Sequence, residues 1–386
     1  MKIKDVVTLV TQSISPETDT KYHLYSLPSY DENQTREEVF GSEIQSNKYL
    51  VPNRCILFNK LNVRFKRIWA IDNQDENKLC STEFLPLVVD ESKVDFKYCL
   101  YLLQSESITD YLCGQNANTS GSHKRIDPHV FLGISIHLPQ LEEQKRIGHL
   151  LASIDAKIRL NRAINQNLEA LAKQLYDYWF VQFDFPNEEG KPYKSSGGKM
   201  VWNETLKMEL PLGWNNSTLE TICNLYQPQT IGTDMLQSNG KFRVYGANGL
   251  VGWYNKYNHE NSEIAMACRG NSCGTLNRTI PYSWITGNAM VVQLKNQSIC
   301  NEYIKQALGY MNITGVITGS GQPQLTRENL KIVPCVSPSD TVLIAYSQKV
   351  APIVNYQIQI IEEIDELTSQ RNELLPLLMN GQVTIK

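Results

Sequence analysis

The stretch from Leu138 to Phe180 restricts the fold of this chain most, because its pattern predicts one long amphipathic helix. Alternating steps of four and three residues from Ile147 to Trp179 mark ten positions, and eight of them are apolar. This spacing is typical of a coiled-coil seam. A helix of this length exceeds what one compact domain can bury, so we expect a rigid spacer that pairs with a second helix. The apolar seam residues assigned to pairing are Ile147, Leu151, Ile154, Ile158, Leu168 and Leu175.

The same pattern returns 199 residues later, where again eight of ten seam positions are apolar. The same offset relates Pro139 to Pro338 at the entrance to each helix. A common spacing of this kind indicates internal duplication with a pseudo-two-fold relation between the halves. The second seam contributes Val350, Ile353, Ile360, Ile364, Leu367, Leu374 and Leu378 to the predicted pairing.

We expect the two helices to pack antiparallel as a coiled coil, with polar seam residues such as Asn161 and Gln357 fixing the register. The alternative is that each helix packs only on its own domain. Pro352 and Pro376 are expected to kink or shorten the second helix. The 32 residue-to-residue steps from Ile147 to Trp179 would span about 48 Å at about 1.5 Å per step. That length corresponds to about 14 base pairs of B-form DNA.

The predicted fold class is α/β (α+β), with two globular domains separated by the two long helices. The globular domains are assigned to residues 1–137 and 184–337, the second including a linker rich in Pro, Gly and Lys. The spacer helices are assigned to residues 138–183 and 338–386, the latter with a short tail. Each domain mixes short β-rich runs with Gly and Asn turns.

Composition narrows the class of protein further. The 386 residues are 41% hydrophobic, and no run of 18 apolar residues occurs, so we expect no contact with a membrane and a cytoplasmic location. The nine cysteines contain no CxxC pair, which favours reduced thiols and no metal site.

Charge is distributed unevenly although the net charge is only −3. Residues 235–327 hold eight basic and three acidic side chains and net +5, whereas residues 338–386 net −3. A basic domain beside an acidic helix indicates an anionic partner for the domain and a protein partner for the helix.

Polar turns in the second domain offer side chains that match base edges, because Arg pairs with guanine and Asn or Gln with adenine. If the Gly-Ser-Gly-Gln-Pro-Gln run is strand-like around Pro323, both glutamines lie on one side of an extended loop. Its glycines would allow close approach to a phosphate. Asn248-Gly249 is also a hairpin-turn signal by itself. The candidates are Asn248, Arg269, Asn271, Asn288, Gly319, Gly321, Gln322 and Gln324.

In the first domain the run from Asn59 to Arg67 carries four cations and no acid. As a strand it would place Lys60, Asn62, Arg64 and Lys66 on one face, suited to phosphate contact. The alternative is a solvated edge strand, where lysine is common. The candidates are Lys60, Asn62, Arg64, Lys66 and Arg67, joined by His123 and Lys124, which match the Gln-Pro-Gln run in the repeat.

The chain resembles the specificity subunit of Type I restriction–modification systems over essentially its whole length. The stretches that carry the resemblance, in this order, are LPQLEEQKRIGHLLASIDAKI at 138–158, WFVQFDFP at 179–186, KPYKSSGGKMVWNETLKMELPLGW at 191–214, YGANGLVGWY at 245–254, TGNAMVV at 286–292, GSGQPQL at 319–325 and LLPLLMNGQV at 374–383. The second helix lacks the Glu-Glu-Gln run of Glu142–Gln144.

The resemblance implies two target-recognition domains that each read one half of a gapped double-stranded DNA site. It also implies that the helices set the gap and dock methyltransferase subunits, which restriction subunits then join. S-adenosylmethionine, ATP and Mg would be used by those partners, so this chain would hold no cofactor and catalyse no reaction.

Two other functions are consistent with parts of the sequence. Asp72, Glu91 and Lys93 could form a magnesium-dependent nuclease site, and Glu189 with Lys191 offers a second Glu-x-Lys pair. A duplicated protein-interaction scaffold without DNA specificity is the other alternative, against which the basic second domain argues.

Overall fold

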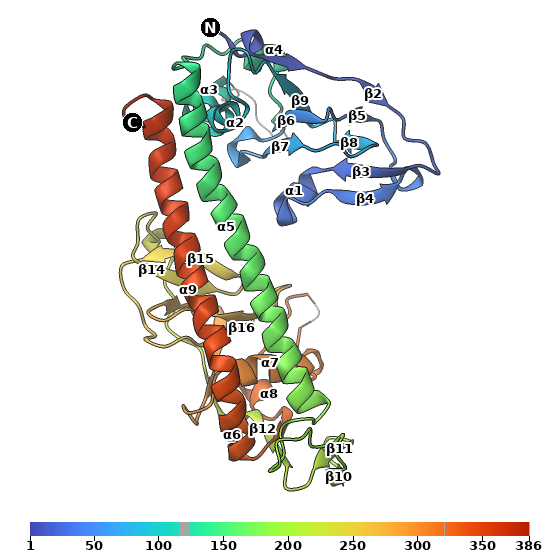
Figure 1. The fold of residues 1–386 in the computed structure, drawn as a ribbon. Coiled ribbons are helices and arrows are strands. Elements are labelled where there is room, and N and C mark those ends of the chain that lie inside the picture. Colours follow the sequence, from blue (N-terminus) through green and yellow to red (C-terminus); the bar gives the residue numbers. More distant parts are fainter. Residues whose placement is uncertain (116–123, 320, 386) are drawn as a thin grey trace. The chain divides into compact units, whose positions relative to one another are not determined.

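A computed structural model describes residues 1–115, 124–319 and 321–385 (Figure 1). Its contacts divide the chain into two compact units, which are described separately. Unit 1 comprises Met1–Leu160 with Ile364–Lys386, and unit 2 comprises Asn161–Glu363. Each of the two long helices therefore contributes one part to each unit. Among the described residues, no helix is long and apolar enough to span a membrane.

Unit 1 contains two sheets and a set of short helices. One sheet is antiparallel, in the order β1-β9-β6-β7, and the other is mixed, in the order β2-β5-β8-β3-β4. The strands are β1 (Val7–Leu9), β2 (Ser13–Ile14), β3 (Lys21–Tyr25), β4 (Glu37–Phe40), β5 (Lys48–Leu50), β6 (Arg54–Asn59), β7 (Ile68–Asp72), β8 (Lys78–Cys80) and β9 (Phe84–Val89). The helices are η1 (Ile3–Asp5), α1 (Leu27–Asn33), η2 (Gly41–Glu43), η3 (Val63–Phe65), α2 (Phe96–Gln104), α3 (Glu106–Gln115) and α4 (Pro128–Leu132).

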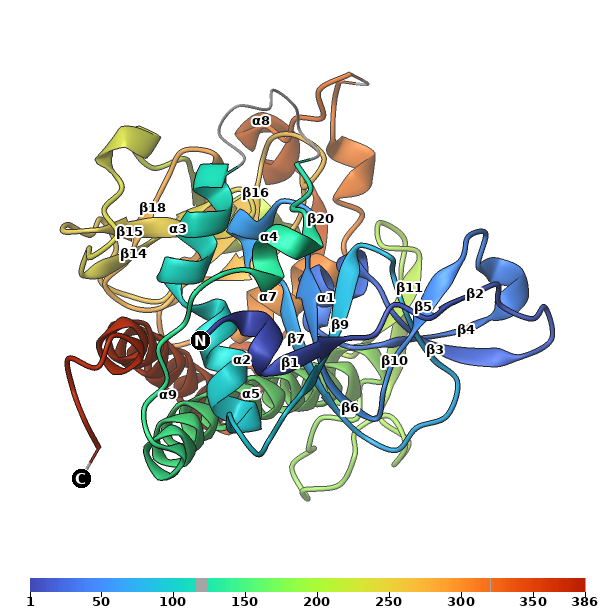
Figure 2. The same ribbon diagram turned by 90° about the horizontal axis from the view of Figure 1, so that it is seen from above.

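The main core of unit 1 lies between the antiparallel sheet, α2 and the first part of α5 (Leu141–Tyr176), and Figure 2 shows α2 beside α5. The side chain of Gln144 fixes the start of α5. It accepts a hydrogen bond from the Asp95 backbone N–H (3.0 Å) and donates one to the Pro139 carbonyl (2.8 Å). The repeat has buried Leu343 at the corresponding position, so Gln144 has an internal structural role.

Unit 2 repeats the sheet order of unit 1 with β13-β19-β16-β17 and adds two smaller sheets and a hairpin. The strands are β10 (Met200–Asn203), β11 (Met208–Pro211), β12 (Asn215–Thr218), β13 (Cys223–Tyr226), β14 (Phe242–Gly246), β15 (Gly249–Tyr254), β16 (Ile264–Ala267), β17 (Leu276–Arg278), β18 (Trp284–Ile285), β19 (Ala289–Leu294) and β20 (Pro334–Ser337). The helices are α6 (Leu219–Ile222), η5 (Thr233–Met235), α7 (Glu302–Tyr310), η6 (Thr314–Val316) and α8 (Arg327–Lys331).

The duplication is visible in the boundaries of the elements. Both bounds of α4 and the first residue of α5 (Leu141) recur 199 positions later, in α8 and at the start of α9 (Asp340–Met379). The mixed helix and strand architecture predicted from the sequence, with two domains and two long helices, is confirmed.

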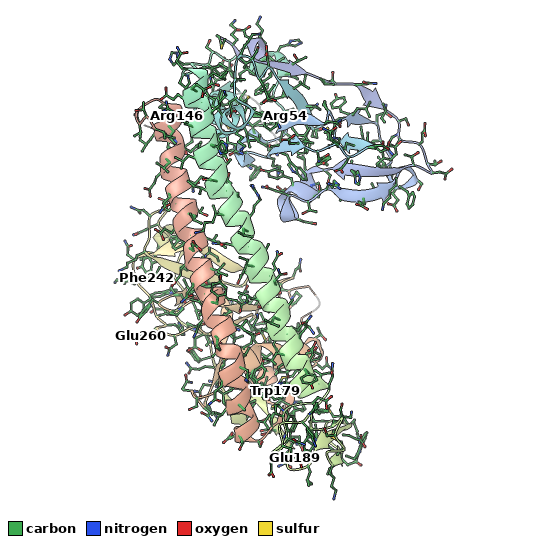
Figure 3. All side chains as sticks on the ribbon, in the orientation of Figure 1. Arg54, Arg146, Trp179, Glu189, Phe242 and Glu260 are labelled. Atoms are coloured by element: carbon green, nitrogen blue, oxygen red, sulfur yellow. The ribbon has the colours of Figure 1, made fainter. Side chains whose placement is uncertain are left out.

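An aromatic cluster anchors the end of the first long helix within unit 2. After Tyr176 the helix widens into the π-helix η4 (Asp177–Val181), a form that adds one residue to a turn. Trp179, labelled in Figure 3, and Phe180 are consequently both buried, with ring centroids 5.7 and 4.9 Å from Tyr346.

The two long helices are antiparallel, as the seam pattern predicted. In unit 1 the Arg371 guanidinium donates to Asp155 (3.0 Å), and in unit 2 the Gln357 amide donates to Glu169 (3.2 Å). The thirteen seam residues named above are all buried or half-buried. The expectation that Pro352 shortens the second helix is wrong, because α9 runs unbroken for 40 residues. Pro352 lies on an exposed position, where water can satisfy the carbonyl that loses its partner, while the neighbouring seam stays buried.

Candidate nucleic-acid interface

Three loops meet at one edge of the antiparallel sheet in unit 2. The Cys268 backbone N–H donates to the Asn288 carbonyl (3.3 Å), and the Cys268 carbonyl accepts from Leu325 N–H (3.0 Å). Arg269 and Gln324 form an isolated β-bridge. The loop between β16 and β17, the turn before β19 and the loop before α8 therefore form a single surface. Five sequence candidates lie on it with exposed side chains: Arg269, Asn271, Asn288, Gln322 and Gln324.

The thiol of Cys268 connects its own loop to the turn before β19 and to Gln227. It accepts a hydrogen bond from the Gln227 amide (3.1 Å) and contacts the Asn288 carbonyl (3.2 Å). Burial raises the pKa of the Cys268 thiol, so the group stays neutral. Its environment suits a structural thiol.

Asn248 lies at the tip of the β14–β15 hairpin, as the Asn248-Gly249 turn signal predicted. Gly246 pairs with Gly249, whose φ of 86° favours glycine. Because β14 and β18 run parallel, with Tyr245 beside Ile285, the hairpin tip and the turn that follows β18 lie at the same end of their strands. Asn248 thus approaches the surface that carries Asn288.

The Gly-Ser-Gly-Gln-Pro-Gln run is not extended along its whole length. Thr318 and Gln324 exchange two backbone hydrogen bonds, 2.9 and 2.8 Å long, so the chain reverses direction between them. Gly319 has a φ of 88°, and a Cβ there would lie 2.5 Å from the Gln322 carbonyl oxygen. The turn itself therefore requires Gly319, whereas a Cβ on the exposed Gly321 would meet no atom within 4 Å.

Unit 1 builds the corresponding edge with the same backbone pattern. The Lys60 N–H donates to the Glu83 carbonyl (2.9 Å), and the Lys60 carbonyl accepts from Ile126 N–H (3.0 Å). Leu61 and Arg125 form the isolated bridge that matches Arg269 and Gln324. The candidates at Lys60–Arg67 and those at Arg269 and Asn271, selected from the sequence without use of the repeat, therefore occupy equivalent loops in the two units.

The strand expected over Asn59–Arg67 is wrong. Strand β6 ends at Asn59, and the chain turns through η3 before β7 begins at Ile68. Asn62 and Lys66 adopt left-handed backbone conformations, with φ of 51° and 45°. These candidates therefore project from a compact loop and share no strand face.

Some of the basic residues on this loop and on the neighbouring segment at Lys124–Arg125 form ion pairs within unit 1, and others do not. Arg67 binds Asp31 (2.6 Å), which raises the pKa of its guanidinium, and Arg125 binds Glu83 (2.7 Å). Among the described residues, no ion pair joins Lys60, Arg64 or Lys66 to a carboxylate. Lys124 borders the loop through its carbonyl, which accepts from Asn62 N–H (2.8 Å), and His123 lies outside the described residues.

Sequence reasoning missed the loop that follows β13. The Gln227 amide also donates to the Gly287 carbonyl (3.1 Å), and a Cβ on Gly287 would lie 2.6 Å from Thr230 Oγ1. Gln229 and Thr230 are exposed beside it. A signal was present, because Gln-Pro-Gln occurs both at 227–229 and at 322–324.

The residues of the nuclease alternative are engaged in ion pairs. Arg54, labelled in Figure 3, binds both Asp72 and Glu91, the latter at 2.7 Å. Lys93 pairs with Asp90 (2.8 Å), and Glu189 pairs with Lys191 (2.9 Å). A guanidinium thus occupies the space between the two carboxylates that would have to hold the metal. Within the described residues, no group of three or more His, Cys, Asp or Glu is placed to hold a metal ion.

Known proteins share both the sequence pattern and the fold. The family model "Type I restriction modification DNA specificity domain" matches residues 1–170 and 211–374. The HindI specificity subunit of Haemophilus influenzae is 31% identical over 129 residues, which are 33% of this chain and 28% of that subunit. The MjaIX specificity subunit of Methanocaldococcus jannaschii is 22% identical over 338 residues, 81% of this chain and 74% of that one.

A solved Type I S subunit from M. genitalium has the same fold, with a TM-score of 0.59, 17% identity and coverage of 98% of this chain and 95% of that one. Fold and sequence together define a duplicated protein with two specificity domains. The chain belongs to the family of Type I restriction–modification specificity subunits, which confirms the resemblance read from its sequence.

Proposed function

We propose that this chain is the sequence-reading subunit of a Type I restriction–modification complex, in which each unit reads one half of a gapped double-stranded DNA site. The observation that carries the proposal is that both units hold the same arrangement of loops beside their antiparallel sheet. Lys60 and Cys268 hold their loops through the same pair of backbone hydrogen bonds, and the loops present polar or basic side chains in both units.

The side chains on the two edges suit different contacts. In unit 2, exposed amides such as Asn288 and Gln322 match adenine, and Arg269 matches guanine. In unit 1, Lys60, Arg64 and Lys66 suit phosphate oxygens, which position a protein on the duplex without reading sequence. Gly321, with open space beside its Cα, allows the phosphate backbone to approach closely.

The long helices are the proposed gap spacer and the docking site for methyltransferase subunits, which restriction subunits join. Exposed apolar side chains on α5 and α9, among them Leu160, Leu171 and Tyr356, offer apolar contacts to a protein partner. The proposed complex acts in the cytoplasm. Its other subunits use S-adenosylmethionine, ATP and Mg, and this chain contributes no catalytic group.

The test is a genome-wide map of N6-methyladenine in cells that carry the cognate methyltransferase gene, with and without the gene for this chain. The expected result is a gapped motif that appears only when this chain is present. Exchange of residues 1–137 for those of a relative should change one half of the motif and leave the other half intact. An unchanged map, or an ungapped motif, would overturn the proposal.

A further inference from the structure

Phe65 is an exposed aromatic residue at the tip of the basic loop of unit 1. Its side chain is 52% exposed, whereas Val63 in the same short helix is buried. Two guanidinium groups lie over the ring, with the Cζ atoms of Arg64 and Arg67 at 4.8 and 4.9 Å from its centroid. Cations attracted to the ring face hold the aromatic group in place at the protein surface.

The base of the loop is fixed to the body of unit 1. The Asn62 N–H donates to the Lys124 carbonyl (2.8 Å), and the Asn59 N–H donates to the Arg67 carbonyl (3.1 Å). Arg67 also makes two hydrogen bonds of 2.6 Å to the Asp31 carboxylate. The guanidinium beside the ring is therefore anchored from below, and Phe65 projects from a rigid support.

The surroundings of the ring favour a polyanion as its partner. Lys60, Arg64 and Lys66 lie on the same loop without an ion pair to any described carboxylate. The neighbouring acids Asp31 and Glu83 are each bound by an arginine. A flat apolar group between cations is complementary to a base step between phosphates, and proteins insert such side chains into duplex DNA as wedges.

We propose that Phe65 is a DNA-bending wedge, which inserts between two adjacent base pairs of the half-site bound by unit 1 while Arg64 contacts the flanking phosphate. This inference rests on the proposed DNA-reading function and adds a distortion of the duplex to it. The equivalent loop of unit 2 has the same length and carries the half-buried Cys273 in place of Phe65. The kink is therefore confined to one half-site.

The experiment uses the full chain and a duplex selected by that chain from a random-sequence library. Dyes flanking each half-site report bending by energy transfer. The wild-type chain should bend the half bound by unit 1 by at least roughly 20°. Phe65→Ala should abolish that bend and weaken binding on the order of tenfold, because a stacked aromatic group is lost.

Two further variants separate a wedge from a structural role. Phe65→Leu keeps an apolar wedge and should retain most of the bend. Phe40→Ala removes a phenylalanine of matched exposure (51%) from β4 of the same unit and should change neither bending nor affinity. All variants should melt at the wild-type temperature, since Phe65 is half-exposed.

The outcomes distinguish the two proposals. If no duplex is enriched in the selection, the DNA-reading function fails and the wedge fails with it. If duplexes are enriched and bound, yet Phe65→Ala bends them as the wild-type chain does, the wedge alone is overturned.

Discussion

Asn161 on the first long helix donates a hydrogen bond from its side-chain amide to the Glu363 carboxylate on the second, at 2.8 Å. The sum of these two residue numbers is 524, and the pairs Asp155–Arg371 and Glu169–Gln357 each sum to 526. A nearly constant sum is the signature of antiparallel helices. Polar seam residues on one helix thus meet carboxylates on the other, which defines the register.

The Asn161–Glu363 contact predicts the effect of a charge at the seam. Asn161→Asp places two carboxylates side by side, because Asn161 is buried and Glu363 half-buried. The free energy of unfolding of this variant should be about 1–3 kcal/mol lower than that of the wild-type chain in urea titrations at pH 7. The double variant Asn161→Asp with Glu363→Gln restores a donor–acceptor pair and should recover most of the loss. Equal destabilisation in the single and double variants would contradict the assigned register contact.

The buried ion pair between Arg278 on β17 and Glu302 on α7 should make unit 2 sensitive to the loss of either partner. Their side chains are 7% and 0% exposed. Glu302→Gln leaves a buried guanidinium without its counter-charge and should cost about 3–5 kcal/mol in chemical unfolding. Glu328→Gln, which removes an exposed partner of Lys331, is the matched control and should leave the unfolding midpoint unchanged. A small effect of Glu302→Gln would show that water reaches the pair.

The stability of unit 2 should fall as the pH is lowered through the histidine range. The ring nitrogens of His259 lie 2.6 Å from Asn258 Oδ1 and 2.9 Å from Tyr226 Oη. Burial lowers the pKa of His259 below its usual 6.5, so the unfolded chain takes up the proton first. This contribution is fully present above about pH 6.5 and is lost as the pH falls through the folded-state pKa.

Unfolding free energies of the wild-type chain and His259→Gln, measured from pH 7.5 to pH 5, isolate the histidine contribution. Burial raises the pKa of nearby Glu263, so that group stabilises unit 2 at low pH and loses its contribution as the pH rises. Glu263 is present in both proteins and cancels in the difference. Parallel pH curves for the two proteins would refute the assignment to His259.

Base readout predicts a position-specific effect of Arg269. The Arg269 side chain lies exposed on the loop surface of unit 2. Arg269→Ala should therefore remove the base preference at one position of the second half-site and weaken binding by about 1–3 kcal/mol. Competition with selected duplexes that differ at single positions measures the loss. Arg327→Ala, which alters an exposed arginine paired with Glu328, should leave the base preference intact. Uniform weakening at every position would instead indicate a phosphate contact.

The proposed docking of a methyltransferase subunit on the long helices predicts that a charge on their exposed face weakens this docking and leaves DNA binding intact. Leu171→Glu introduces a charge on the exposed face of α5 and should reduce co-purification with the methyltransferase subunit, while direct binding of a duplex is kept. Met235→Glu alters an apolar residue of similar exposure in η5 and serves as the control. Retention of the methyltransferase by Leu171→Glu would move the docking site away from this face.

Local patterns in the sequence were sufficient for the elements whose structure depends on neighbouring residues. The seam from Ile147 onward predicted a long helix, because helical periodicity repeats every few residues. The 199-residue offset predicted a second long helix entered at Pro338, and α9 begins at Asp340. The Asn248-Gly249 pair predicted a hairpin because a tight turn is specified by two or three residues.

Contacts between residues far apart in the sequence decided the features that local patterns did not predict. Alternating polar side chains made Lys60–Lys66 look like a strand, yet a hydrogen bond from Asn62 to Lys124 holds this segment as a loop. The surface that unites Arg269, Asn288 and Gln324 likewise exists only after the sheet brings three loops together. The sequence by itself determined the duplication, the helices and the residue types available to contact DNA. Only the tertiary structure decided which of them share an edge, because hydrogen bonds between loops far apart in the chain leave no periodic trace in the sequence.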